Sequence, residues 1–287
     1  MKKITTLLLA MVIAAMLLTG CSKNDGGSEE KTFITVKGSD TMVHLASTWA
    51  EVFMEENPGI EISVTGGGSG TGIAALLNGT TDICAASRKI KDKETALAAS
   101  KGIEANEIIV ARDGIAVVVN PSNPVSELSI EQIGKIFTGA TPKWDGVGGN
   151  SAGIEVLSRE SSSGTYVFFQ KKVLSKKDYS PKAKLMPATS AIVQSISSNE
   201  NAIGYIGLGY ASAAKGKIKV LSVKADSSSP AVIPSEATVK SGEYEVSRPL
   251  QLYTNGETKG VVKKFIDFCL SDRGQEIVKE TGYVAIN

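Results

Sequence analysis

The chain has few of the side chains on which metal sites and most catalytic sites depend. Its 287 residues include three cysteines and a single histidine, His44. No cysteine–histidine cluster has the spacing of a metal site, and with a single histidine the chain has few candidate groups for hydrolysis. We therefore expect no metal, no cofactor and no enzymatic activity.

The sequence also lacks a surplus of charge of either sign. It contains 31 basic and 30 acidic residues, which gives a formal net charge of +1. Proteins that bind nucleic acid usually carry a basic surplus or stripe, so we expect no nucleic-acid partner. Long-range steering of an anion would be weak as well, and any anion selectivity must come from local contacts.

The hydrophobic run at the N-terminus is too short to span a membrane. It covers residues 4–18 after Lys2 and Lys3, the pattern of an export signal. The run ends in Leu18-Thr19-Gly20-Cys21, which resembles the bacterial lipobox. The small pair before the cysteine favours this interpretation over an ordinary signal peptide with an incidental cysteine. We predict a signal peptide at residues 1–20, then a lipidated Cys21 that begins a flexible tether over residues 21–31.

The two other cysteines, Cys84 and Cys269, lie in apolar segments. Each is expected to be a small buried hydrophobic residue. A disulfide between them is possible in an exported protein, and spacing alone does not establish it.

Apolar segments of strand length alternate with segments of helical spacing from residue 32 to the end. Examples are the predicted strands at residues 32–37, 60–65 and 114–120 and the predicted helices at residues 129–137 and 258–270. Such alternation predicts an α/β fold with mixed, mostly parallel sheets flanked by helices. The length favours two lobes, for which we predict residues 32–113 plus 249–287 and residues 114–248.

Three predicted strand-to-helix turns are rich in small polar residues. They hold Ser39 with Asp40, Ser69 within a glycine run, and Ser163-Gly164-Thr165 preceded by Arg159. The first backbone N–H groups of a helix have no partner within it, and the helix dipole makes that end positive. Hydroxyl groups and an arginine add further donors, so each turn is suited to an oxyanion. The alternative is that the serines only cap helices and the arginine forms a surface ion pair.

With these residues in view, the chain resembles the PstS family, the phosphate-binding lipoproteins of bacterial phosphate ABC importers. The resemblance covers essentially the whole mature chain. It rests on four motifs: Gly38-Ser39-Asp40-Thr41-Met42, Gly67-Gly68-Ser69-Gly70-Thr71-Gly72, the segment from Thr81-Asp82-Ile83 to Ser87-Arg88, and Arg159 with Ser163-Gly164-Thr165.

This resemblance implies a periplasmic-binding-protein-like fold of type II, with two α/β lobes joined by a hinge and phosphate bound in the cleft between them. It further implies a monomer on the outer face of the cell membrane that delivers phosphate to the permease subunits of an ABC importer. The residues that it implies as ligands of inorganic phosphate are Ser39, Asp40, Thr41, Ser69, Ser87, Arg159, Ser163, Gly164 and Thr165.

The sequence departs from the family pattern at two positions. Ser161 stands where many relatives carry an acidic residue that holds the cleft arginine, so Glu160 or another carboxylate is expected to do so. Ser87 stands where some relatives place an aspartate. Asp40 is then the expected carboxylate of the cleft, and it would accept the proton of hydrogen phosphate while repelling sulfate.

Three other functions stay open. The ligand could be another tetrahedral oxyanion, such as sulfate or molybdate. The chain could instead be a secreted phosphatase or esterase, or a structural surface protein in which the three turns are only helix caps.

Overall fold

Strands and helices alternate along the chain, as the apolar pattern predicts. The structure, a computed structural model, describes residues 32–287. The predicted signal peptide, Cys21 and the tether lie outside these residues. Within residues 32–287, no helix is both long and apolar enough to cross a membrane.

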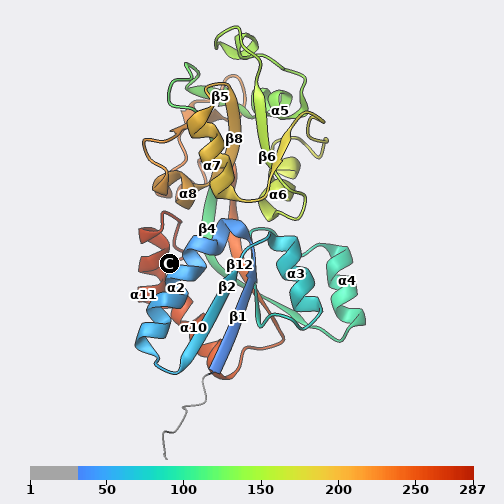
Figure 1. Cartoon of the computed structure of the whole chain (residues 1–287), viewed down its shortest axis with the longest axis vertical. Helices are drawn as coiled ribbons and strands as arrows, with labels where there is room; N and C mark the ends of the chain where they lie inside the picture. Colours follow the sequence, from blue (N-terminus) through green and yellow to red (C-terminus); the bar gives the residue numbers. More distant parts are fainter. Residues whose placement is uncertain (1–31) are drawn as a thin grey trace, which may run out of the picture. The chain divides into compact units, whose positions relative to one another are not determined.

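The lower half of the described chain, as drawn in Figure 1, holds a parallel β-sheet between two layers of helices. Its elements are β1 Thr32–Gly38, η1 Asp40–Met42, α2 Val43–Glu56, β2 Ile60–Thr65, α3 Ser69–Leu77, β3 Ile83–Ala86, α4 Asp92–Ser100, α10 Gly260–Leu270 and α11 Asp272–Glu280. Helices α2, α10 and α11 pack together on one face of the sheet, and α3 and α4 pack together on the other (Figure 1).

The upper half carries the remaining short strands and helices. They are β5 Glu127–Ser129, α5 Ile130–Thr138, η2 Trp144–Val147, β6 Glu155–Arg159, α6 Gly164–Lys172, β7 Lys184–Met186, α7 Thr189–Ser198, β8 Ala202–Gly207, α8 Leu208–Ala213, β9 Lys219–Val220, β10 Ser222–Lys224, β11 Ala231–Val232 and α9 Glu236–Ser241. Helix α5 begins with the capping box expected from the sequence: the Ser129 hydroxyl accepts from the Gln132 backbone, and the Gln132 side chain accepts from the Ser129 backbone.

Two long strands, β4 Ala105–Val119 and β12 Ser247–Asn255, run through both halves (Figure 1). They pair with each other in antiparallel fashion, and β12 also pairs with β3 while β4 pairs with β8. The main sheet therefore has the order β2-β1-β3-β12-β4-β8-β6-β7. It is mixed, as predicted, with parallel pairs at both flanks and antiparallel pairs at these shared strands.

Along β4 and β12, the side chains pack first in the hydrophobic core of one half and then in that of the other. Side chains of β4 as far as Ala111 pack in the core of the lower half, whereas Ile115 and Val117 pack in that of the upper half. At the start of β12 the same change falls between Val246, the residue before the strand, and Leu250. The crossing between the halves therefore lies at residues 112–114 of β4 and 247–249 of β12. Residues 32–287 form one compact unit, and the lobe boundaries stay a prediction.

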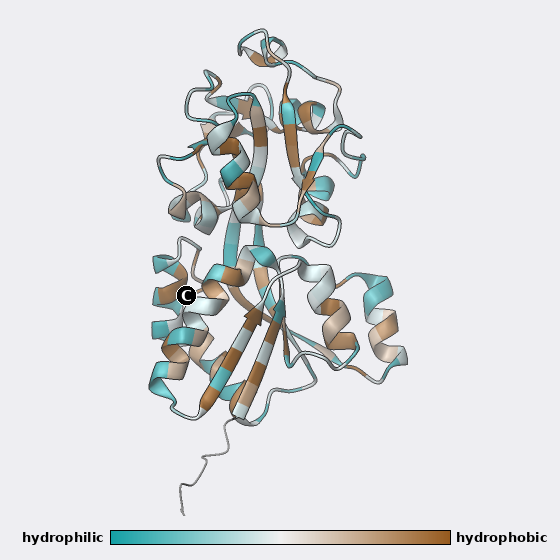
Figure 2. Ribbon diagram, viewed as in Figure 1, coloured by the Kyte–Doolittle hydropathy of each residue, from teal (hydrophilic) through white to brown (hydrophobic). Residues whose placement is uncertain are grey.

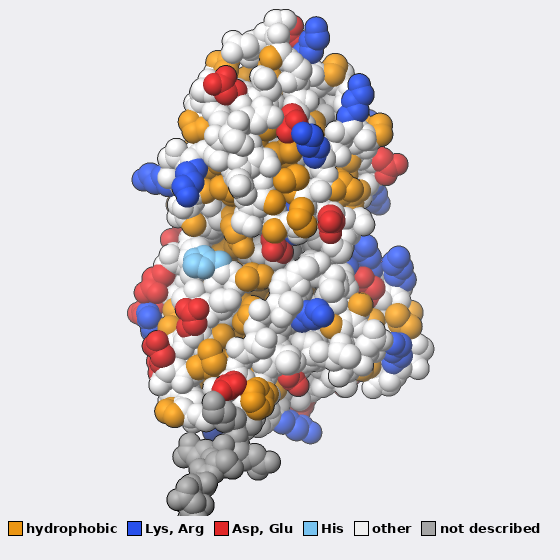
Figure 3. Space-filling view, in the orientation of Figure 1, with side chains coloured by type: hydrophobic (Ala, Val, Ile, Leu, Met, Phe, Trp, Pro, Cys, Tyr) orange, Lys and Arg blue, Asp and Glu red, His pale blue; other side chains and the backbone are white. Residues whose placement is uncertain are grey.

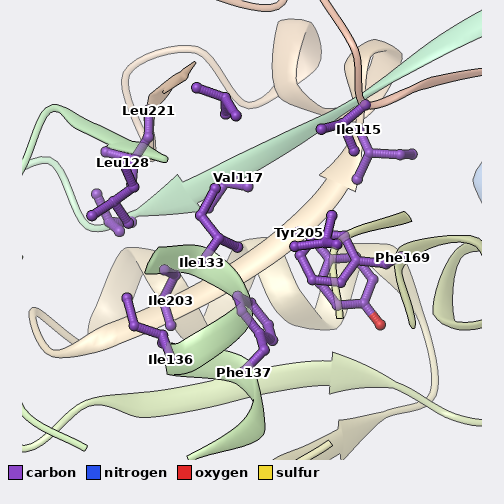
Figure 4. Packing of buried hydrophobic residues seen from close by; sticks show 14 of the residues in the cluster. Ile115, Val117, Leu128, Ile133, Ile136, Phe137, Phe169, Ile203, Tyr205 and Leu221 are labelled. Atoms are coloured by element: carbon purple, nitrogen blue, oxygen red, sulfur yellow. The ribbon is translucent and has the colours of Figure 1, made fainter. Parts of the chain in front are cut away.

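Strand β8 and the upper-half part of β4 are buried on both faces, which explains their nearly continuous apolar sequences. On β4, Ile115, Val117 and Val119 pack in one cluster with α5 and α6, whereas Ala116 and Val118 pack in another with α7. Figure 4 shows Val117 beside Ile133, and the ring of Phe169 stacked on Tyr205 with centroids 4.0 Å apart. Hydrophobic residues concentrate on the strands and on the helix faces turned toward them (Figure 2).

Both cysteines of the described chain are free and buried. Cys84 lies on β3 and Cys269 on α10, in different hydrophobic clusters. Burial raises the pKa of the Cys84 thiol to about 12, so it stays protonated at neutral pH and unreactive. The small-hydrophobe interpretation is therefore confirmed, and the disulfide left open by the sequence is not formed.

Candidate functional site

Three serines from separate turns of the lower half meet at the ends of its strands. Ser39 follows β1, Ser69 is the first residue of α3, and Ser87 follows β3. The Ser39 hydroxyl donates to Ser87 Oγ at 2.8 Å, and the Ser69 and Ser87 hydroxyls lie 3.3 Å apart. Because β1, β2 and β3 are parallel, the segments that follow them emerge at the same edge of the sheet.

The first residues of α6 in the upper half face these serines. A Cβ atom at Gly164 would lie 2.3 Å from Ser69 Oγ and 2.7 Å from Ser87 Oγ, so only glycine allows this contact without a shift of the serines or of the helix. Thr165 Oγ1 lies 2.7 Å from Thr41 Oγ1, and the Gly70 backbone donates to the Ser162 carbonyl at 2.9 Å. The two predicted halves of the site thus come into direct contact.

The contacting side chains form what we call the hydroxyl cluster, the group Ser39, Thr41, Ser69, Ser87 and Thr165. Every member is at least 98% buried. Burying hydroxyl groups lowers stability unless each finds a hydrogen-bond partner. Apolar residues would pack this contact more favourably, so its polarity indicates a role other than folding.

Helix capping explains the presence of only some of the serines at the three turns. Ser163 caps α6, since its hydroxyl accepts from the backbones of Thr165 at 3.1 Å and Tyr166 at 3.4 Å. Ser39, by contrast, makes no side-chain capping bond to the turn that follows it. The alternative that all three turns are merely caps therefore fails at Ser39.

Arg159 is held by Asp40 from the opposite half. Its Nη1 lies 3.1 Å from Asp40 Oδ2, and the Thr189 backbone donates to the same oxygen at 2.7 Å. The guanidinium also donates to the Met186 and Pro187 carbonyls and to Thr189 Oγ1. The sequence predicted Glu160 or another carboxylate as the partner of the arginine; in the structure that partner is Asp40, whereas Glu160 is exposed.

Two further buried arginines lie beside the cluster, each paired with a carboxylate. Arg88 donates to both carboxylate oxygens of Glu94 at 2.7 Å. Arg248 lies 3.0 Å from Asp113 and donates to the Ser87 carbonyl at 2.7 Å and to Thr165 Oγ1 at 2.9 Å. Arg248 and Asp113 were not predicted from the sequence, although both lie in mostly buried strands, where charged residues are rare.

At Asp113 and Glu94, burial and pairing with an arginine shift the pKa of the carboxyl group in opposite directions. Burial raises the pKa of Asp113, and the Arg248 guanidinium works in the opposite direction. Burial also acts to raise the pKa of Glu94, but hydrogen bonds from Arg88 and the Lys91 backbone outweigh it, so that pKa is lowered. With each arginine matched by an acid, the surroundings of the hydroxyl cluster have little net charge. An anion there would be held mainly by neutral donors.

Other parts of the described chain offer less to a small anion. No group of three or more His, Cys, Asp or Glu residues within residues 32–287 could hold a metal ion, and His44 is exposed on α2.

A groove of about 340 Å³ lies between α7 and α8, but none of its lining residues belongs to the hydroxyl cluster. Charged side chains of both signs are interspersed over the face shown in Figure 3, without a single basic patch.

Comparison with known proteins relates most of the chain to one family. Residues 23–273 match the PBP superfamily domain. The chain is 34% identical over 282 residues to the phosphate-binding protein PstS of Staphylococcus epidermidis, covering 95% of this chain and 86% of the relative. The PstS of Staphylococcus haemolyticus is 35% identical over 285 residues, with coverages of 95% and 89%.

Solved structures agree with this relationship. A phosphate ABC transporter substrate-binding protein from Clostridium perfringens, solved with bound phosphate and described as putative, has a TM-score of 0.81 and 31% identity. The match covers 89% of this chain and all of the other. A phosphate transport receptor from Vibrio cholerae has a TM-score of 0.69 and 29% identity, with coverages of 88% and 99%. The chain therefore belongs to the PBP superfamily and, within it, to the PstS family.

Proposed function

We propose that the chain binds inorganic phosphate at the hydroxyl cluster and delivers it to a membrane ABC importer. The observation that carries the proposal is the convergence of buried hydroxyls and the N-terminus of α6 from opposite halves. It is supported by the family membership and by the relatives named for phosphate binding. The proposed ligand residues are Ser39, Thr41, Ser69, Ser87, Ser163, Gly164 and Thr165, with Arg159 oriented by Asp40.

The hydrogen bonds that these residues can donate are, taken together, strong enough to bind phosphate tightly. A phosphate dianion that leaves water loses a large solvation free energy, which only many short hydrogen bonds offset. Hydrogen bonds to a charged group contribute about 1.5–3 kcal/mol each, and a helix N-terminus adds about 0.3–1 kcal/mol. About ten such donors sustain binding of roughly −8 kcal/mol, a micromolar dissociation constant or tighter, after the ordering losses.

Calorimetry on the purified protein with phosphate, sulfate and molybdate tests this function. We expect phosphate to bind with micromolar or tighter affinity and the other anions more weakly. Phosphate at about 100 times its dissociation constant should also add about 2.7 kcal/mol to the free energy of unfolding, which thermal melts detect.

The other functions that the sequence left open predict different results. Tighter binding of sulfate or molybdate would assign another oxyanion, and no heat with any anion would reject a binding protein. Turnover of a chromogenic phosphate ester that is lost in Ser163→Ala would instead indicate a phosphatase.

We further propose that a lipid on Cys21 anchors the protein to the outer face of the cell membrane, where it acts as a monomer. The motif before Cys21 supports the anchor. In cells, Cys21→Ser should move the protein from the membrane fraction to the soluble exported fraction. Unchanged retention in the membrane fraction would remove this part of the proposal.

A further inference from the structure

Arg248 lies where the lower half, the upper half and the hydroxyl cluster meet. It is on β12 directly opposite Asp113 on β4, within the segments where both strands cross from one core to the other. Its side chain is 2% exposed and that of Asp113 is fully buried. A buried ion pair of this kind adds little net stability compared with well-packed apolar residues. Its presence at the crossing therefore suggests a function other than stability.

The guanidinium of Arg248 contacts one cluster residue from each half. Nη1 donates to the Ser87 carbonyl, and Nη2 donates to Thr165 Oγ1. Asp113 fixes the guanidinium from behind, because its Oδ2 accepts from Nη2 while its Oδ1 accepts from the Leu208 backbone. The Phe168 ring, 5.3 Å from the guanidinium carbon, packs against it as well. Arg248 is thus held on several sides, and Nη1 and Nη2 donate to one cluster residue from each half, while its buried Nε has no hydrogen-bond partner in the described chain.

The bond to Thr165 determines what that hydroxyl can do. When a cation donates to a hydroxyl oxygen, the hydroxyl hydrogen points away from the cation, and the O–H group becomes a stronger donor through polarisation. Away from Arg248, Thr165 Oγ1 faces Thr41 Oγ1 and the rest of the hydroxyl cluster. Thr165 is therefore fixed as a donor toward an anion in the cluster.

We propose that Arg248 is a positioning residue of the phosphate site. It aligns Thr165 as a donor and holds Ser87 in place across the contact between the two halves. This inference rests on the proposed phosphate function and assigns to that site a second arginine besides Arg159. Asp113 matches the charge of Arg248, so the guanidinium positions its neighbours without making the site basic.

The test is a double-mutant cycle on phosphate affinity with the purified protein. Lysine keeps the charge of Arg248 but cannot reach Asp113, Ser87 and Thr165 together, so Arg248→Lys should weaken phosphate binding about tenfold. Thr165→Val removes the hydroxyl at nearly constant shape. If Arg248 acts through Thr165, adding Arg248→Lys to Thr165→Val should change the affinity by less than threefold.

Two control variants test whether a loss of phosphate affinity comes from the positioning role of Arg248 or from general structural damage. Arg112→Gln changes the exposed arginine next to Asp113 and should leave the affinity unaltered. A neutral pair, Arg248→Gln with Asp113→Asn, retains the cross-strand shape without buried charge and should lose about as much affinity as Arg248→Lys. It serves as the test variant if Arg248→Lys does not fold.

The outcomes are distinct. Fully additive losses in the cycle, or an unchanged affinity in a folded Arg248 variant, would overturn the inference while leaving the phosphate function intact. A wild-type protein that binds no phosphate would instead reject the proposed function.

Discussion

Replacing Gly164 with alanine should weaken phosphate binding at least a hundredfold while the protein stays folded. The added Cβ atom would lie 2.3 Å from Ser69 Oγ, 2.7 Å from Ser87 Oγ and 3.0 Å from Ser69 Cβ. Contacts below about 3 Å force one side to move, so either both serines rotate away or the two halves separate. Each outcome removes at least two donors from the anion, a loss of about 3 kcal/mol or more.

The fold itself has no need for glycine at this position. Gly164 is the first residue of α6 and is not among the glycines with positive φ. Alanine is a better helix former than glycine, so the melting temperature without phosphate should stay within a few degrees of wild type. The expected effect is therefore on closure and binding, not on folding.

Calorimetry with phosphate, together with a thermal melt, measures both quantities on one sample. Gly153→Ala is the matched control, because a Cβ atom there meets nothing within 4 Å, and we expect wild-type affinity from it. If the Gly164→Ala protein binds phosphate as tightly as wild type, the contact of Gly164 with Ser69 and Ser87 is not part of the phosphate site.

The sequence predicts the parts of this site that depend on local structure. Ser39, Ser69 and Ser163 were predicted because a strand, a small polar turn and a helix follow one another within a few residues at each of them. Local patterns of this kind determine where helices begin and strands end. The parallel order of β1, β2 and β3 then brings the turns to one edge of the sheet.

The parts that depend on distant contacts were not predictable in the same way. The contacts of Asp40 Oδ2 with Arg159 and the Thr189 backbone were not predicted, because they depend on how the halves meet. Arg248 and Asp113 become partners only through the register of β12 against β4. Helices α8 and α9 were missed because six residues are too few for a helical period to stand out.

Replacing Asp40 with asparagine should weaken phosphate and sulfate binding by similar factors, about 30- to 100-fold for phosphate, and also lower stability. Asparagine can keep an oxygen at the position of Oδ2, where it still accepts from the Thr189 backbone, but it removes the negative charge that pairs with the Arg159 guanidinium. The side chain of Arg159 is only 3% exposed. Loss of the carboxylate charge from this pair costs about 2 kcal/mol, which corresponds to a drop of roughly 4–8 °C in melting temperature.

The matched control is Asp267→Asn, which makes the same chemical change in an exposed ion pair. Asp267 lies 2.6 Å from Lys263, and both side chains are more than half exposed. Exposed pairs of this kind contribute between zero and about 1 kcal/mol. We therefore expect Asp267→Asn to keep wild-type affinity and to melt within about two degrees of wild type.

Comparing the two anions separates the two roles open to Asp40. If Asp40 accepts the proton of hydrogen phosphate, its carboxylate repels sulfate by about 2–5 kcal/mol, and Asp40→Asn would weaken phosphate while strengthening sulfate. If Asp40 instead orients Arg159 across the two halves, the ratio of the two affinities stays constant while both decline. The contacts of Oδ2 favour the second result. Selectivity for phosphate would then come from the geometry of the hydroxyl cluster, whose oxygens can accept the phosphate proton as well as donate.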